Sequence, residues 1–386
     1  MTSPIQGHHG TVRFDRNELS GAFGDIGTDL PLIVGMILAS GLDAASVLIL
    51  FGAMQLLTGL SYGLPMPVQP LKAVAVILIT EKLGSHILYG GGLIIGVTML
   101  LLAVTGLVDW LARVIPKSVV RGIQFGLGLQ LAWLALREYL RADGLIGYGL
   151  AAIGFIVTIL LIGNRRYPPA PFVLSIGVVY AFLFKPDAIA ALGDIGFRLP
   201  QFHTPAVSDV LQGFALLALP QIPLSIGNSI LATRQIAQDF FPEQPIGVRK
   251  ISLTYSLMNL VSPFFSGIPT CHGSGGMAGH YAFGARTGGS VVIYGSMYLV
   301  LGLFFSNGFG RIVQVFPLSI LGVVLLFEGL TLMRLVADLA DSTRDFSTCL
   351  LVGLMASGLP YGYLLGLVVG TLLHYFSRKS LVELTK

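Results

Sequence analysis

Long apolar runs, separated by short polar connections, make up most of the chain between residues 23 and 376. A membrane-crossing helix needs about 20 mostly apolar residues, and shorter apolar runs are typical of helices broken inside the membrane. The longest polar connection, Lys185–Asp209, separates two sets of seven runs. The pattern predicts an all-α polytopic membrane protein of about fourteen spans, at residues 23–39, 45–62, 71–80, 87–108, 119–136, 148–163, 170–184, 210–233, 251–265, 274–283, 290–309, 315–333, 346–358 and 361–376.

The composition agrees with a lipid surrounding. Of the 386 residues, 54% are hydrophobic and 11% are charged, and the mean hydropathy is +0.81. Soluble domains average about 25% charged residues. The net charge of +4 does not indicate nucleic-acid binding, because the Lys and Arg residues fall in short loops. Cys271 and Cys349 lie in apolar segments, so we expect free thiols and no disulfide framework.

The positions of Lys and Arg indicate an orientation. If the N-terminus is cytoplasmic, sixteen of these 23 residues lie on the cytoplasmic side, six on the other side, and one, Lys72, within the membrane. Cytoplasmic loops of membrane proteins carry such an excess of positive charge. We therefore expect both termini in the cytoplasm, as tails of residues 1–20 and 378–386.

The two halves resemble each other in motif and spacing. Gly63-Leu-Pro has a counterpart in Gly267-Ile-Pro, and Val114-Ile-Pro-Lys-Ser has one in Val315-Phe-Pro-Leu-Ser. Because seven is an odd number of spans, the second copy enters the membrane from the opposite side. This predicts an inverted repeat of residues 21–205 and 206–377. Chance similarity between helices rich in Gly and Pro is the alternative.

Two stretches, Gly63–Lys72 and Gly267–Gly276, contain residues that cannot continue a helix. Broken backbone at membrane depth is tolerated where it is buried in protein or lines a cavity. In an inverted repeat, the short helices that follow would point their N-termini at each other, and the N–H groups there bind anions. We expect an anion site formed by Gln69, Pro70, Lys72, Gly273, Ser274 and Gly275, with kinks needed only for packing as the alternative.

Further polar side chains lie in the spans beside these breaks. Asp25 and Asp29 are four residues apart, and Gln221 and Asn228 are seven apart, so each pair shares a helix face. Gln55 adds an amide in the second span. We expect Asp25, Gln55, Gln221 and Asn228 to line the substrate cavity, with hydrogen bonding between helices as the alternative.

Asp25, His272 and Glu328 are the candidates for proton coupling, since an ionisable side chain in a span is a functional candidate by default. Asp25 is the best placed, because its span should border both breaks. Lys72 has two open roles, attraction of an anionic substrate and an ion pair with Asp25. A purely structural role stays open for His272, and Glu328 has no partner identifiable in the sequence.

Four motifs resemble the molybdate transporter family, which is related to the SulP sulfate permeases. They are Gly24-Asp-Ile-Gly-Thr28, Met66-Pro-Val-Gln-Pro70 with Lys72, Pro220-Gln-Ile-Pro223 with Asn228, and Cys271-His-Gly-Ser-Gly-Gly276. The resemblance implies a seven-plus-seven inverted repeat, shared with nucleobase transporters. Spans one to four and eight to eleven would form a core domain, and the others a gate domain. The last motif brings Cys271 and His272 into the expected substrate site.

The residues alone predict a secondary transporter of a small anion, and the resemblance specifies molybdate uptake. The alternatives are a sulfate transporter and a nucleobase–proton symporter, for which we would expect a Glu near the second break, where His272 stands. No nucleophile–base pair or metal-ligand cluster stands out, so we expect no enzyme activity, cofactor or metal. The expected location is the plasma membrane (the inner membrane of a bacterium), with a homodimer as one possible assembly. The chain ends about ten residues past its last span, so we expect no cytoplasmic STAS domain of the kind that SulP permeases usually carry.

Overall fold

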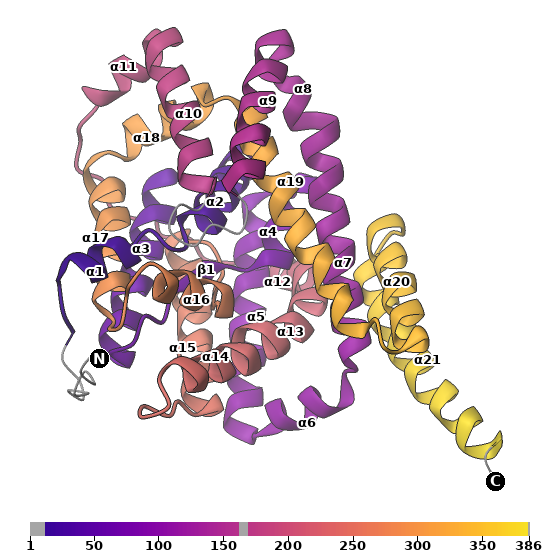
Figure 1. Ribbon diagram of the computed structural model, residues 1–386. Coiled ribbons are helices and arrows are strands. Elements are labelled where there is room, and N and C mark those ends of the chain that lie inside the picture. Colours follow the sequence, from indigo (N-terminus) through magenta and orange to yellow (C-terminus); the bar gives the residue numbers. More distant parts are fainter. Residues whose placement is uncertain (1–11, 162–168, 385–386) are drawn as a thin grey trace, which may run out of the picture.

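The computed structural model describes residues 12–161 and 169–384, which fold mainly into helices packed side by side (Figure 1). Parts of both predicted tails and the end of the sixth predicted span, at residues 162–163, lie outside the described residues. The first half contains α1 (Arg16–Gly21), α2 (Ile26–Ser40), α3 (Ala44–Tyr62), β1 (Val68–Pro70), α4 (Lys72–Glu81), α5 (Ser85–Thr105), α6 (Leu107–Val114), α7 (Lys117–Leu134), η1 (Ala135–Tyr139), α8 (Leu140–Ala142), α9 (Gly144–Leu161), α10 (Pro169–Phe184) and α11 (Pro186–Leu192).

The second half begins with a long interrupted helix, in which π-helical segments alternate with α-helix. It contains α12 (Val207–Gly213), η2 (Phe214–Ala218), α13 (Leu219–Leu224), η3 (Ser225–Ala232), α14 (Thr233–Phe240), α15 (Val248–Val261), η4 (Ser262–Phe265), β2 (Thr270–His272), α16 (Ser274–Ala282), α17 (Gly289–Phe304), α18 (Ser306–Val315), α19 (Leu318–Arg334), η5 (Leu335–Leu339), α20 (Thr343–Gly358) and α21 (Gly362–Leu384).

Each of the fourteen predicted apolar segments overlaps a helix, but fewer helices are long enough to cross a membrane alone. Among the described residues, six helices have the required length and apolar composition, or seven if α17 and α18, which meet at a bend of 95°, form one span. Shorter apolar helices cover Ile26–Ser40, Pro169–Phe184 and Gly362–Phe376. The prediction of a helical membrane protein is therefore confirmed, while the fourteen crossings and the seven-plus-seven division stay predictions.

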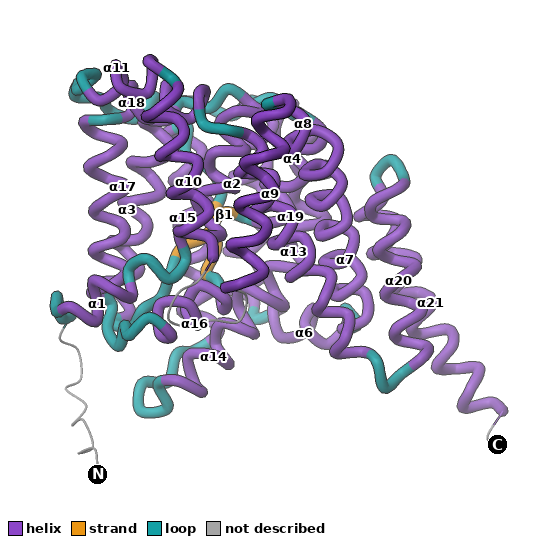
Figure 2. The backbone as a smooth tube through the Cα atoms, turned by 45° about the horizontal axis from the view of Figure 1, so that its top comes forward, coloured by secondary structure: helices purple, strands orange, loops and turns teal. Residues whose placement is uncertain are grey.

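The two broken stretches form strands, which the all-α prediction did not contain. β1 and β2 pair antiparallel, with Gln69 opposite Cys271, and every residue of both strands is buried. Figure 2 shows the pair in the middle of the helices. Prolines at positions 65, 67, 70 and 269 favour extended backbone in these stretches. Pairing then gives buried backbone groups hydrogen-bond partners that neither stretch has alone.

One amide side chain from the preceding helix supports each strand. Gln55 of α3 donates to the carbonyl oxygen of Val68 over 2.7 Å and accepts from its N–H over 2.9 Å. Asn259 of α15 does the same for Thr270, at 2.6 and 3.0 Å. Val68 and Thr270 are the first residues of their strands, so the two supports correspond in the two halves. The amide of Gln55, predicted to line the substrate cavity, is thus engaged with backbone.

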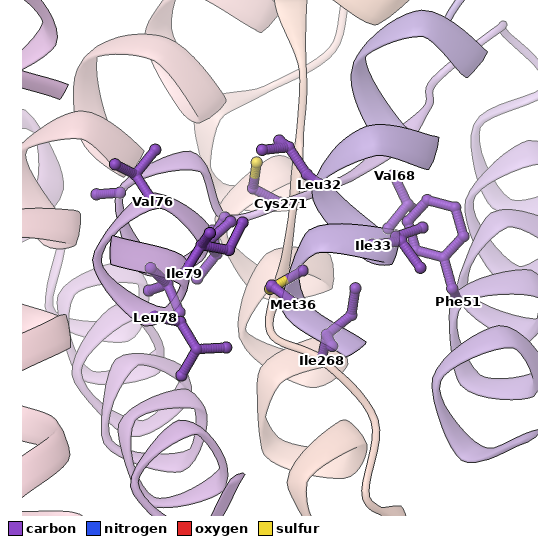
Figure 3. Close-up of a cluster of buried hydrophobic side chains, with 14 of the residues drawn as sticks. Leu32, Ile33, Met36, Phe51, Val68, Val76, Leu78, Ile79, Ile268 and Cys271 are labelled. Atoms are coloured by element: carbon purple, nitrogen blue, oxygen red, sulfur yellow. The ribbon is translucent and has the colours of Figure 1, made fainter. Parts of the chain in front are cut away.

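Buried apolar side chains hold the strands between α2 and α4. Figure 3 shows Leu32 of α2 beside Cys271 and Ile33 of α2 beside Val68, with Val76 and Ile79 of α4 on the other side of Cys271. All of these side chains are buried. Since lipid is as apolar as these residues, close packing between the helices is a main source of their association. It fixes the position at which α4 begins, directly after β1.

The segment assigned to an N-terminal tail includes a helix that is anchored to the rest of the protein. Glu18 of α1 is 1% exposed. Its carboxylate accepts hydrogen bonds from the N–H groups of Arg286, Thr287 and Ser290, at 2.9, 2.8 and 3.0 Å. These residues lie just before and in the first turn of α17, and the N–H groups at the start of a helix have no acceptor within the helix. The segment predicted as a tail, residues 1–20, thus includes a helix that is bound to the rest of the protein through Glu18.

We expect Glu18→Ala to lower the melting temperature of the detergent-solubilised protein. The substitution leaves three N–H groups without their acceptor, and each unsatisfied buried donor costs about 1–3 kcal/mol. Glu243→Ala is the matched control, because Glu243 is exposed in the loop after α14. Equal melting temperatures for the two variants would contradict an anchoring role for Glu18.

Candidate functional site

A cavity of about 290 Å³ lies where the two strands meet the long helices α7 and α19. One wall comes from β1, β2, the start of α16 and the interrupted helix at α13 and η3, and the other from α7, α19 and η5. Of the residues predicted from the sequence, it brings together Gln69, Lys72, Gln221, Asn228, Cys271, His272, Gly273, Ser274 and Gly275. Four other predicted residues, Asp25, Gln55, Pro70 and Glu328, are not among the described residues that line the cavity.

The N-terminus of α16 opens toward this cavity. Gly273, the residue before the helix, provides no side-chain cap, and no acceptor among the described residues is bonded to the N–H groups of Ser274, Gly275 and Gly276. A Cβ atom on Gly275 would meet no atom within 4 Å, whereas one on Gly276 would collide with the carboxylate of Asp25. This helix end therefore presents free N–H groups and a partial positive charge to the cavity.

The N-terminus of α4 differs, because the protein itself occupies it. The side-chain oxygen of Gln221 accepts from the N–H groups of Ala73 and Val74, at 3.0 and 3.3 Å. The N–H of Leu71 donates to the carbonyl oxygen of Pro269 over 3.1 Å. The expectation that the N–H groups of both helix ends bind the anion therefore does not fit Ala73 and Val74 of α4. Gln221 caps α4, which leaves α16 as the end that is available to a ligand.

Lys72 pairs with Glu328, whereas the ion pair considered from the sequence was one with Asp25. Its ammonium nitrogen lies 2.6 Å from a carboxylate oxygen of Glu328, on α19. Asp25, the partner proposed from the sequence, instead accepts from the side-chain amide of Gln69, with both carboxylate oxygens 2.7 Å from the nitrogen. The sequence alone could not identify Lys72 as the partner of Glu328, because only the fold brings α4 and α19 together. Lys72 still borders the cavity, with 30% of its side chain exposed.

The two aspartates of the first predicted span lie behind the cavity wall. Asp25 is 3% exposed at the start of α2, and Asp29 is fully buried one turn later. Asp29 accepts a hydrogen bond from the hydroxyl of Tyr294 over 3.2 Å. Asp25 touches the site through Gln69, whose side chain forms part of the cavity wall. A change at Asp25 would therefore reach a bound ligand through one intervening side chain.

His272 is a fully buried part of the wall with both ring nitrogens engaged. One nitrogen lies 2.7 Å from the hydroxyl of Thr254, and the other lies 3.3 Å from the carbonyl oxygen of Pro67. The ring also packs edge-on against Tyr62, with 5.5 Å between ring centroids. These contacts connect α3, α15 and both broken stretches, so they fit the structural role left open for His272.

Sequence reasoning missed four polar residues of the cavity, namely Arg121 and Gln124 on α7, Ser229 in η3 and Thr331 on α19. Arg121 is one of the sixteen Lys and Arg residues that the sequence pattern places on the cytoplasmic side. The guanidinium donates to the side-chain oxygen of Gln124 over 2.8 Å and pairs with Asp338 of η5. The signal in the sequence was an Arg within an apolar run, which is expensive in a membrane unless it faces a partner or a cavity.

The sequence is similar to that of known proteins over most of its length. The model of a family described as "Molybdate transporter of MFS superfamily" matches residues 17–131 and 213–332. Molybdate transporter 2 of Arabidopsis thaliana is 35% identical over 408 residues, which cover 92% of this chain and 87% of that protein. Molybdate transporter 1 of Chlamydomonas reinhardtii is 25% identical, over 91% of this chain and 90% of its own.

Two kinds of solved structure resemble the fold. The murine Solute Carrier 26 family member A9 anion transporter, in its inward-facing state, matches with a TM-score of 0.70 and 14% identity over 97% of this chain and 69% of its own. The transmembrane domain of the cyanobacterial bicarbonate transporter BicA matches with a TM-score of 0.66 and 16% identity, over 93% of this chain and 96% of its own. At these identities the likeness concerns the fold alone.

Proposed function

The chain belongs to the molybdate transporter family, and from this premise we propose that it is a secondary transporter that takes up molybdate. The observation that carries the proposal is the open N-terminus of α16 in a cavity that Lys72 and Arg121 also border. Free N–H groups and two cationic side chains suit a small oxyanion. The related proteins are transporters, which is consistent with our expectation that the chain is not an enzyme.

Sulfate is the second candidate, because it has the same tetrahedral shape and charge as molybdate. A nucleobase is less well supported by the cavity. Flat aromatic ligands favour stacking on Phe, Tyr or Trp, and none of these residue types is among the described residues of the walls. Besides leucines at positions 127, 224, 332 and 335, the wall carries amides, hydroxyls, glycines and two cations, and these polar groups suit an anion with many acceptor oxygens.

We also propose that the spans form a seven-plus-seven inverted repeat of residues 21–205 and 206–377, with core and gate domains. The antiparallel strand pair supports this division, as do the corresponding supports from Gln55 and Asn259. In this arrangement the cavity lies between core and gate, with α7 and α19 on the gate side. The charge distribution of the loops supports cytoplasmic termini. We place the protein in a plasma membrane, with a homodimer as one possible assembly.

Uptake of labelled molybdate into proteoliposomes tests the transport function. We expect time-dependent uptake that excess unlabelled molybdate prevents, with sulfate as a competitor whose strength gives the selectivity. Nucleobases should not compete. Protein-free liposomes provide the baseline, and uptake no greater than this baseline would contradict the proposal.

Energy coupling follows from the charge of the substrate. A dianion entering a negative-inside cell works against about 2.3 kcal/mol per charge per 100 mV, or about 4.6 kcal/mol in all. Concentrative uptake therefore needs a co-transported cation, and we propose protons with Asp25 as their main carrier. Glu328 and His272 are the other candidates, but Glu328 is held by Lys72 and His272 has both nitrogens engaged. Asp25 contacts the cavity wall through Gln69.

We expect Asp25→Asn to transport molybdate down its gradient but to lose the stimulation that an acidic exterior gives to the wild type. The amide has the shape of a protonated carboxyl group but cannot release a proton. The measurement is uptake with and without an imposed pH gradient, at the same membrane potential. Wild-type uptake that ignores the pH gradient would refute proton coupling. Full coupling in Asp25→Asn would remove only Asp25 from the role.

A further inference from the structure

Arg121 and Gln124, one turn apart on α7, are polar residues of the cavity wall that α7 and α19 form, and the N-terminal residues of α16 line the same cavity. Gln124 is 1% exposed, yet its side-chain NH₂ has no hydrogen-bond partner among the described residues. The Nε–H group of Arg121 is likewise buried and unpaired there. Buried donors without an acceptor are uncommon in folded proteins, because each costs free energy. Both donors belong to side chains that line one cavity, so they are candidates for contact with a ligand that has acceptor oxygens.

Contacts within the protein hold these two side chains in place. Arg121 donates to the oxygen of Gln124 over 2.8 Å, which leaves the NH₂ of that amide available for another acceptor. On its other side Arg121 pairs with Asp338, and Lys117 lies 3.5 Å from the same carboxylate. The guanidinium is therefore fixed before any ligand binds, so less side-chain entropy is lost on binding.

We propose that Arg121 and Gln124 are direct contacts of the bound oxyanion and form the gate-side half of its site. The inference rests on the proposed function and adds to it a second set of donors from a different wall. The α16 end supplies partial charges from one side, and Arg121 supplies a full charge from the other. An anion between them connects the two walls, and the full charge favours a dianion over a monoanion.

The ratio of two affinities tests this charge discrimination. Molybdate and perrhenate are both tetrahedral oxyanions with four oxygens, but molybdate carries two charges and perrhenate one. We expect Arg121→Gln to weaken molybdate binding about tenfold or more and perrhenate binding by clearly less, where tenfold corresponds to about 1.4 kcal/mol. Arg121→Lys should bind molybdate more tightly than Arg121→Gln but less tightly than the wild type, because it keeps the positive charge but loses the paired N–H donors of the guanidinium.

Gln124→Met tests the unpaired amide separately. The side chain keeps its length but loses its donors, so both anions should bind more weakly by a similar factor, about fivefold, as expected for one lost hydrogen bond. Arg334→Gln is the matched control, because Arg334 is exposed in the last turn of α19 and lies outside the cavity wall. Its charge change is the same as that of Arg121→Gln, and both affinities should stay at the wild-type level.

Calorimetric titration of the purified, full-length variants in detergent gives these affinities, with melting temperatures as the test of folding. Wild-type molybdate affinity in folded Arg121→Gln or in Gln124→Met would overturn the proposal. An equal loss of affinity for molybdate and perrhenate in Arg121→Gln would also overturn it. If Arg121→Gln does not fold, Gln124→Met, which keeps the ion pair with Asp338, decides alone. Failure of the proposed function gives a different result, because wild-type protein would then bind neither anion.

Discussion

Gly275→Leu is expected to abolish molybdate binding and transport in a protein that remains folded. A Cβ atom at this position meets nothing within 4 Å, so the backbone of α16 can accept a larger residue without a clash. Leucine is also a better helix former than glycine. Its side chain would lie over the free N–H groups of Ser274 and Gly275 and fill the space next to them. A dianion would then lose both the donors and the volume that it requires.

Gly149→Leu provides the matched comparison. Gly149 is an exposed glycine of α9, and a Cβ atom there also has open space around it. The two variants share the same chemical change in an apolar helix, so they separate loss of the site from general effects on folding. We expect wild-type molybdate affinity and melting temperature in Gly149→Leu. A folded Gly275→Leu protein with unchanged affinity would exclude the α16 end as the anion site.

The broken stretches could be predicted because their signals are local. Several prolines and glycines lie close together in residues 63–72 and 267–276. Such a cluster disfavours a continuous helix, so both breaks could be predicted from the sequence alone. Their pairing as strands was not recognisable. The register that places Gln69 opposite Cys271 depends on how the fold brings together residues about 200 positions apart. A strand of three residues is too short for its own sequence pattern to reveal its pairing partner.

The amides of the site show the same division between local and long-range information. Gln221 was recognised as a polar residue near the breaks, but its role as the cap of α4 depends on the position of α13 against that helix. Asn259 was missed altogether. Its only signal was its place before the second break, equivalent to that of Gln55 before the first. Comparing the halves at the level of single polar residues would have found it.

The number of crossings is uncertain from sequence for a physical reason. The helix Val207–Phe240 is 34 residues long, whereas the predicted span covers residues 210–233, and it continues through Pro220 and Pro223. The π-helical segments η2 and η3 lie on either side of these prolines. Such local adjustments re-satisfy the backbone groups that proline leaves free. Apolar runs therefore gave the positions of the helices better than their ends.

The ion pair between Lys72 and Glu328 leads to the last prediction. Lys72→Gln should reduce molybdate binding strongly, because it removes a cation from the cavity wall. It should also destabilise the protein, since a mostly buried carboxylate loses its partner at a cost of about 3 kcal/mol. Lys72→Arg should keep part of the affinity, because the charge remains. Transport assays and melting temperatures of the same preparations separate the two effects.

The double variant Lys72→Gln with Glu328→Gln distinguishes the two roles of Lys72. Two neutral amides can hydrogen-bond to each other, so the melting temperature should return close to that of the wild type. If Lys72 attracts the substrate, molybdate binding stays lost in this stable protein, because no positive charge has been restored. If Lys72 only neutralises Glu328, removing both charges restores transport. We expect a stable protein without molybdate uptake, and recovery of uptake in the double variant would contradict a substrate role for Lys72.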